Sequence, residues 1–246
     1  DRLIGLFDAE PEVHKLANQI KAAGIRRVTG RVVADDTIFD RRRGVADSGY
    51  ATSPWIGPLS GLSFNAGYTS SSLSRFSSNP ARLAAVTLAR SLRARGVRVR
   101  KAVAIKRTPQ AALANRVARQ VSPNMVWMAR ITNLNSVNYW AEMLMKNLGA
   151  EFRKKGTTWA GTGVVMRTMA AKGIRVRSVD GSGLTRSNRA SPHNVVKLLV
   201  KARRAPWGSA FTRSLPTADV DGTLGSRMRG SAAQRRCHAK TGTLTG

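Results

Sequence analysis

Apolar and polar residues follow two different spacings in the first part of the chain. Helical spacing predicts a helix over about residues 11–23 and another over residues 81–95. Residues 28–35 and 97–105 alternate as strands do, and residues 3–7 form a short apolar strand candidate. The pattern therefore predicts alternating helices and strands in this part of the chain.

The pattern changes to longer helices from about Val121 onward. Residues 125–149 contain two apolar helical stretches, which the polar step at residues 132–135 separates. A helix also fits residues 161–173, and another fits residues 191–204, where Ser191 is a natural N-cap. The tail, RRCHAKTGTLTG, predicts a strand.

Residues 40–80 separate the helix and strand candidates of the first part. This segment is rich in Gly, Ser, Pro and Asn and has little periodicity, which predicts long surface loops or a linker. The change of texture along the chain thus indicates two domains, and a hydrophobic content of 42% in 246 residues is enough for real cores.

The charge balance is the most unusual bulk property. Lys and Arg number 42 against 13 Asp and Glu, a formal net charge of +29, which favours polyanionic surroundings. The basic residues are scattered, without an aromatic-interleaved stripe or a nucleic-acid motif, so specific nucleic-acid binding is disfavoured. Anionic cell-wall polymers or lipid head groups are the candidate partners.

Few residues have the chemistry of a metal or disulfide site. A single cysteine, Cys237, excludes an internal disulfide, and His14, His193 and His238 lack metal-ligand spacing. The sequence therefore implies no metal.

A motif near the end of the chain has the chemistry of a carboxylate-binding edge. Lys240 supplies positive charge, and the hydroxyls of Thr241 and Thr243 supply hydrogen-bond donors. Gly242 lets a substrate backbone come close. Alone, these residues also fit an ordinary strand that ends in a turn.

A second motif places Ser136 and Asn138 on either side of Val137. In a short loop both polar side chains can face a cleft, where the hydroxyl would relay a proton and the amide would hold a substrate amide. Ordinary helix capping is the alternative, because Ser and Asn favour helix N-termini.

A third motif is the turn that contains Asp180, Gly181, Ser182 and Gly183. The two glycines make a tight loop with an exposed backbone, and Asp180 is suited to tie that loop to nearby amides. The spacing is not G-x-G-x-x-G and no Walker lysine follows, which excludes a phosphate-binding loop. A surface turn without function is the alternative.

The order and flanks of the three motifs resemble a known family. Serine β-lactamases and penicillin-binding proteins carry S-x-x-K, S-D-N and K-T-G. The chain is similar to successive blocks of the D-alanyl-D-alanine carboxypeptidase/endopeptidase family, the class C low-molecular-mass penicillin-binding proteins of peptidase family S13. The blocks are NSVNYWAEMLMKNLG, DGSGLTRSNRASPHNVVKLL, FTRSLPTADVDGTLGSRM and AKTGTLTG, and residues 5–40 resemble the start of that family's inserted domain.

The resemblance implies an α/β (α+β) fold class. A penicillin-binding, serine β-lactamase-like domain would be interrupted by an inserted α/β domain. Residues 1–110 would be a partial inserted domain that lacks the further nested domain of some members, with only the Gly/Ser-rich residues 65–80 in its place. Residues 111–246 would be a partial catalytic domain.

The resemblance also implies acyl transfer from a D-Ala-D-Ala peptide to a serine, without a cofactor. Ser136 would help carry a proton to the leaving amine, Asn138 would hold the substrate amide, and Lys240 would shape the local field. Thr241 and Thr243 would bind the terminal carboxylate of the peptide, and the strand that bears them would supply an N–H to the oxyanion hole. β-Lactams would trap the same serine.

Two departures from the family pattern affect this expectation. No serine has a lysine three positions later, so the S-x-x-K nucleophile is not in this sequence. Since that motif precedes the inserted domain in the family, and strands are expected after the third motif, we expect a chain truncated at both ends. Val137 stands where the family usually has Asp.

The sequence leaves two functional hypotheses for an exported, periplasmic or cell-wall protein. The first is a DD-carboxypeptidase/endopeptidase that acts on peptidoglycan stem peptides. The alternative is an inactive relative that binds peptidoglycan or anionic wall polymers, which the missing nucleophile and Val137 favour.

Overall fold

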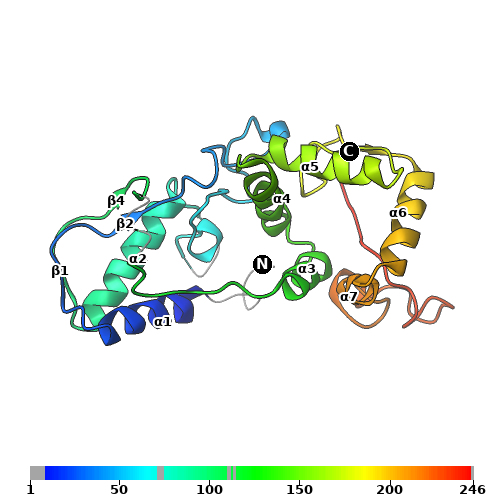
Figure 1. The fold of residues 1–246 in the computed structure, drawn as a ribbon. Coiled ribbons are helices and arrows are strands. Elements are labelled where there is room, and N and C mark those ends of the chain that lie inside the picture. The colour runs from blue at the N-terminus through cyan, green and yellow to red at the C-terminus, as the bar shows by residue number, and fades with distance from the viewer. Residues whose placement is uncertain (1–8, 71–74, 110–111, 113–114, 245–246) are drawn as a thin grey trace. The chain divides into compact units, whose positions relative to one another are not determined.

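The structure is a computed structural model that describes residues 9–70, 75–109, 112 and 115–244 (Figure 1). The chain forms two compact units, one that extends to Ser122 and one that starts at Pro123. Each unit has its own elements and its own buried residues. The assignment of residues 1–110 to an inserted domain stays a prediction.

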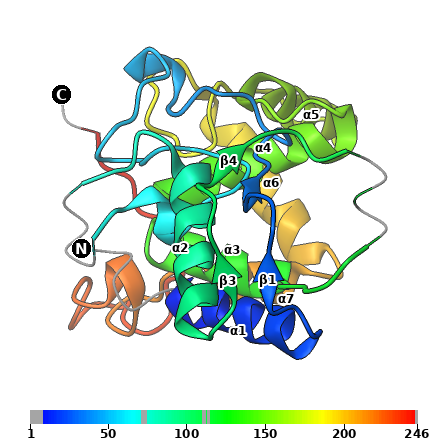
Figure 2. The ribbon, with the colours of Figure 1, turned by 90° about the vertical axis from the view of Figure 1, so that its left-hand side faces the viewer.

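Where the first unit is described, it contains two α-helices and four very short strands. Strand β1 pairs in parallel with β3, and β2 pairs in parallel with β4 (Figure 2). The elements are α1 (Ala9–Ala22), β1 (Arg27–Val28), β2 (Val33–Ala34), α2 (Pro80–Ala94), β3 (Arg98–Val99) and β4 (Ala104–Ile105).

Helix α2 forms the core of this unit with α1 and the strands. The side chain of Asn79 caps α2 by accepting from the N–H of Arg82 at 3.0 Å, and Pro80 occupies the first turn. Small residues on α2 bring its backbone close to its neighbours. The core residues are Ala17, Ala89, Leu92, Val97 and Val99 in one cluster and Ala34, Ala81 and Ala85 in another.

The strands are shorter than the sequence predicts. The prediction of one continuous strand over residues 28–35 and another over residues 97–105 is wrong, because two separate strands of two residues stand in place of each. The first piece of each segment pairs in one ladder and the second piece in another, and the residues between them have no ladder partner. The strand predicted at residues 3–7 lies outside the described residues.

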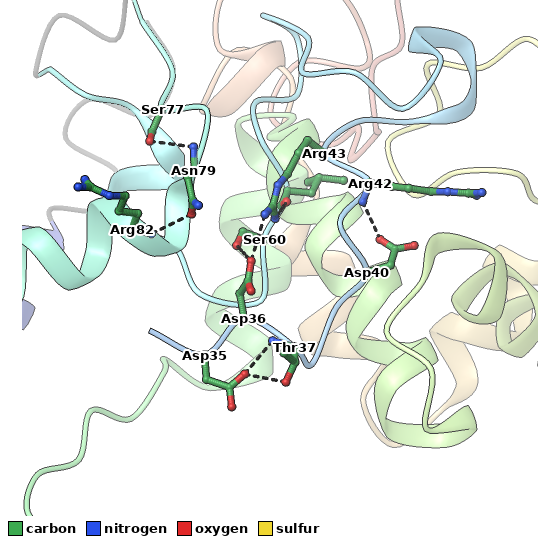
Figure 3. A network of polar contacts seen from close by, with 11 residues as sticks. Asp35, Asp36, Thr37, Asp40, Arg42, Arg43, Ser60, Ser77, Asn79 and Arg82 are labelled. Atoms are coloured by element: carbon green, nitrogen blue, oxygen red, sulfur yellow. Dashed lines mark hydrogen bonds and ion pairs between the residues drawn. The ribbon is translucent and has the colours of Figure 1, made fainter. Parts of the chain in front are cut away.

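A polar network holds the loop that follows β2 (Figure 3). The carboxylate of Asp36 accepts from Arg43 Nη2 at 3.1 Å and from Ser60 Oγ at 3.3 Å, and Arg43 Nη1 donates to the carbonyl of Leu59 at 2.8 Å. Asp36 and Ser60 are buried, so these bonds compensate the burial of their polar atoms. The segment predicted as loops, residues 40–80, is thus tied down by side chains where it is described.

Asp35 fixes the backbone on either side of the same loop. Its Oδ1 accepts from the N–H and the hydroxyl of Thr37, and its Oδ2 accepts from the N–H of Thr108 at 2.6 Å. Burial alone would raise the pKa of this carboxyl, but the hydrogen bonds from Thr37 and Thr108 outweigh burial and lower the pKa to about 2.

We expect Asp35→Asn to destabilise the protein at pH 7, because the amide nitrogen cannot accept from the N–H of Thr108. The loss should be only about 1 kcal/mol, since the site is largely solvated. A folded pKa below the unfolded value means that the carboxylate stabilises above about pH 4 and that this stability is lost as the pH falls toward 2. Urea unfolding should therefore show a difference from wild type that shrinks between pH 4 and pH 2.

The matched control is Asp40→Asn, which removes one charge in the same loop and keeps an oxygen for the N–H of Arg42. It should change stability by only a few tenths of a kcal/mol, roughly the range for surface sites. Equal effects of Asp35→Asn and Asp40→Asn at pH 7 would contradict the role given to Asp35.

The second unit is mostly helical (Figure 1). Helix α4 packs along α5, α3 packs against α7, and β5 and β6 form an antiparallel pair. The elements are α3 (Met125–Leu134), α4 (Asn138–Arg153), α5 (Thr158–Ala171), β5 (Val176–Arg177), β6 (Arg189–Ala190), α6 (Pro192–Arg204) and α7 (Gly208–Ser214), with a 3₁₀ turn at Gly222–Leu224.

Helices α4 and α5 approach each other through glycine. A Cβ on Gly161 would lie 1.9 Å from the carbonyl oxygen of Met145, and a Cβ on Gly149 would lie 3.0 Å from the backbone nitrogen of Gly161. Thr157 caps α5 by accepting from the N–H of Ala160 at 3.0 Å. The pair is therefore packed backbone to backbone.

The tail does not form the predicted strand. An antiparallel bridge joins Thr217 to His238, and residues 239–244 adopt no regular secondary structure. A strand needs a neighbouring extended segment to complete its hydrogen bonds, and no described segment lies along residues 240–244 as a ladder partner. No described helix is both long and apolar enough to cross a membrane.

Candidate functional site

The structure brings Ser136 and Lys240 into direct contact. Lys240 Nζ donates to Ser136 Oγ at 2.7 Å, although 104 residues separate the two in sequence. The same nitrogen donates to the carbonyl of Thr241 at 2.8 Å, which fixes the direction of the lysine side chain. Two of the predicted catalytic residues thus lie within hydrogen-bond distance.

The junction of α3 and α4 sets the position of Ser136. Helix α3 ends at Leu134, and Ser136 takes a left-handed backbone conformation with φ of 54°. The next residue, Val137, bonds through its N–H to the carbonyl of Thr132 and is only 6% exposed. Ser136 therefore occupies a tight turn between two helices.

Position 137 is a core position in this turn. The buried side chain of Val137 separates Ser136 and Asn138, which are both half-buried, and Asn138 is the first residue of α4. An apolar side chain suits such a position. The substitution of Val for the family's usual Asp therefore falls at a position that faces the core.

A pair of hydroxyls holds the segment that follows Lys240. Thr241 Oγ1 donates to Thr223 Oγ1 at 2.8 Å. Gly242 has open space where a Cβ would lie, and Thr243 is exposed. Sequence reasoning did not assign Thr223 to the site, although its sequence block, DGTL, was one of those that resembled the family.

The predicted Gly-rich turn is organised by Asp180. Its Oδ1 accepts from the N–H of Gly183 at 2.9 Å and from the side chain of Asn188 at 2.8 Å, while Oδ2 accepts from the N–H of Thr185 at 2.8 Å. Asp180 is 4% exposed, so these bonds form away from solvent. The carboxylate of Asp180 thus determines the path of the loop.

Glu142 is a second organising carboxylate, which sequence reasoning missed. Its Oε1 accepts from the N–H groups of Gly181 and Ser182 at 2.9 and 2.7 Å, and the residue is 0% exposed. A Cβ on Gly181 would lie 2.5 Å from the carbonyl oxygen of Ala141, so helix and loop touch through their backbones. An acid one turn after Asn138, flanked by the apolar residues Trp140, Ala141, Met143 and Leu144, was the available sequence signal.

The pKa of Glu142 is raised because the side chain is buried. The hydrogen bonds from Ser182 and Gly181 oppose that shift, and the nearby charge of Asp180 adds to it. Lys146 lies one helical turn further along α4 and is also fully buried. Helix α4 therefore carries an acid and a base inside the unit.

The described residues show no metal site. No three His, Cys, Asp or Glu side chains among them gather as metal ligands would. The side-chain hydrogen bonds described for the motif residues join hydroxyls and an amine: Ser136 with Lys240, and Thr241 with Thr223.

Comparison with protein families identifies the chain. The model of the D-Ala-D-Ala carboxypeptidase 3 (S13) family matches residues 6–78 and 63–246. The chain therefore belongs to the S13 family, a family of class C penicillin-binding proteins. The prediction made from its motif blocks is confirmed.

Two curated relatives share part of their length with this chain. It is 36% identical over 180 residues to a D-alanyl-D-alanine carboxypeptidase of Actinomadura sp. (strain R39), an alignment that covers 68% of this chain and 33% of the relative. It is 30% identical over 132 residues to a penicillin-sensitive carboxypeptidase A of Dictyostelium discoideum, covering 51% of this chain and 25% of the relative. The chain thus spans a third or less of these relatives.

Solved structures show the same fold. Penicillin binding protein 4 of Haemophilus influenzae matches 96% of this chain and 67% of its own, with a TM-score of 0.79 and 18% identity. The same protein complexed with a β-lactam matches 69% of this chain and 40% of its own, with a TM-score of 0.61 and 25% identity. The predicted mixed α/β, penicillin-binding fold class is confirmed.

We expect Glu142→Ala to destabilise the protein by about 3 kcal/mol, because two partly buried N–H groups lose a fully buried acceptor. Glu142→Gln keeps an oxygen at the same place and should cost roughly 1 kcal/mol. Urea unfolding followed by circular dichroism measures both values.

Glu151→Ala is the matched control, because Glu151 is an exposed acid on the same helix. It should change stability by less than about 0.5 kcal/mol. If Glu142→Ala were no more destabilising than Glu151→Ala, Glu142 would not be holding the loop.

Proposed function

We propose that the protein is a serine-type D-Ala-D-Ala carboxypeptidase/endopeptidase and that this chain supplies part of its active site. The observation that carries the proposal is the 2.7 Å hydrogen bond between Lys240 and Ser136, which joins two family motifs in space. Membership of the S13 family and the carboxypeptidase relatives support the same reaction class.

The contact gives Ser136 a defined role in proton transfer. A serine hydroxyl that accepts from Lys240 still has its own proton to donate. The positive charge of the amine favours the alkoxide-like character that Ser136 acquires as it gives this proton away. Ser136 is thus suited to protonate the amine that leaves from the substrate.

The reaction proceeds through an acyl-enzyme. The hydroxyl oxygen of a serine attacks the carbonyl carbon between two D-alanine residues, and the C–N bond breaks. The proton that this serine loses passes through Ser136 to the departing amine. Water then hydrolyses the ester and frees the serine. The attacking serine is not assigned to this chain, because none of its serines has a lysine three positions later.

The remaining motif residues hold the substrate. Asn138 binds an amide of the peptide, and Thr241 and Thr243 bind its terminal carboxylate, with Gly242 leaving room for its backbone. β-Lactams acylate the same serine, a proposal that the β-lactam complex of the Haemophilus influenzae neighbour supports.

The substrate places the protein outside the cytoplasm, where peptidoglycan lies. The net charge of +29 suits surroundings rich in anionic wall polymers or lipid head groups. The first unit is the inserted domain and the second is part of the penicillin-binding domain.

The full-length protein, with any sequence beyond these 246 residues, should form a one-to-one covalent adduct with a fluorescent penicillin in intact-mass spectrometry. Ser136→Ala should lower the second-order acylation rate by roughly 100-fold, the usual effect of losing a proton-transfer group. Stopped-flow fluorescence measures that rate.

Ser122→Ala is the control, since Ser122 is an exposed serine at the unit boundary, and it should acylate at the wild-type rate. Absence of any adduct on the full-length protein would overturn the proposal in favour of an inactive binding protein. An unchanged rate in Ser136→Ala would remove Ser136 from the mechanism.

A further inference from the structure

The turn at Asp221–Leu224 touches both sides of the Ser136–Lys240 contact. On one side, Gly222 has φ of 56°, and a Cβ there would lie 2.4 Å from the carbonyl oxygen of Leu134, two residues before Ser136. On the other side, Thr223 bonds to Thr241, the residue after Lys240. The turn therefore lies between the two segments that form the site.

Asp221 and Thr217 attach the same turn to the residues before Lys240. Asp221 Oδ1 accepts from the N–H of Thr217 at 2.8 Å, and Thr217 Oγ1 lies 3.1 Å from His238 Nδ1. The N–H of Ala239 donates to the carbonyl of Pro216 at 3.0 Å. Lys240 and Thr241 are thus anchored both before and after the lysine.

Thr241, a proposed substrate-binding residue, has a hydroxyl that bonds to Thr223. Among the described side-chain bonds, this is the one that the Thr241 hydroxyl makes. Thr241 Oγ1 donates to Thr223 Oγ1 at 2.8 Å. A hydroxyl has one proton and two lone pairs, and its hydrogen rotates to suit its partners. When a carboxylate accepts the proton of Thr241, the hydroxyl of Thr223 can donate to the oxygen of Thr241.

We propose that Thr223 is a positioning residue that orients the Thr241 hydroxyl toward the terminal carboxylate of the substrate, and so sets specificity for peptides with a free C-terminus. The inference rests on the proposed function, in which Thr241 binds that carboxylate. Thr223 Oγ1 accepts from Thr241 in this structure, and it can donate to Thr241 when a carboxylate takes the Thr241 proton. A hydroxyl performs both roles through a single rotatable O–H group, which the isosteric valine lacks.

The test compares Thr223→Val, which has nearly the same shape without the hydroxyl, with Thr223→Ser, which keeps it. The substrates are N-acetyl-L-lysyl-D-alanyl-D-alanine and the same peptide with a C-terminal amide, and the enzyme is the full-length protein. Thr223→Val should raise KM for the carboxylate peptide roughly tenfold and leave kcat within about twofold, because a bond to bound substrate is weakened. Thr223→Ser should restore KM.

Thr212→Val is the matched control, since the hydroxyl of Thr212 bonds only within α7 among the described contacts, to the carbonyl of Gly208. It should leave KM unchanged for both peptides. A wild-type KM in Thr223→Val, or an equal loss for the carboxylate and amide peptides, would overturn the inference in favour of a purely structural Thr223.

Titration calorimetry separates this inference from the proposed function. If the wild-type protein binds the carboxylate peptide more tightly than the amide but releases no D-alanine, the proposed function fails. Thr223 is then judged by Kd, which Thr223→Val should raise roughly tenfold for the carboxylate peptide alone. Equal affinity of the wild type for both peptides would overturn the inference directly.

Discussion

A buried carboxylate ties helix α4 of the second unit to the loop that begins at Asp180. Glu142 joins helix α4 to the loop of Asp180 through two backbone N–H groups, while Gly161 lets α5 lie against the same helix. Buried amides without an acceptor are costly, so the loop has one strongly preferred position against α4. Because α4 begins at Asn138, two residues after Ser136, this constraint also fixes the helix that follows the proposed proton donor.

The proposed site is assembled from segments that are remote in sequence. The turn between α3 and α4 supplies Ser136, the tail supplies Lys240, and the turn at Asp221–Leu224 contacts both. Neighbouring groups hold the side chains of the tail, since Lys240 donates to the carbonyl of Thr241 and Thr241 donates to Thr223. Preorganisation of this kind lets hydrogen bonds act on the transition state without reordering side chains during the reaction.

The sequence predicted the helices better than the strands or the supporting residues. Caps such as Ser191 and apolar spacing are local, so the helices formed close to where the pattern placed them. Strand pairing depends on distant partners, which is why residues 28–35 break into β1 and β2 and the tail stays irregular. The motifs indicated Ser136 and Lys240, but Glu142 and Thr223 act through contacts with residues 39 and 18 positions away, which no local pattern reveals.

The most direct test of the proposed site is a crystal structure of the full-length protein acylated by a β-lactam. We predict that Ser136 and Lys240 stay within hydrogen-bond distance, that both face the acylated serine, and that the inhibitor carboxylate lies against the hydroxyls of Thr241 and Thr243. An acylated serine remote from Ser136 and Lys240, or a carboxylate bound away from Thr241, would contradict the proposed site.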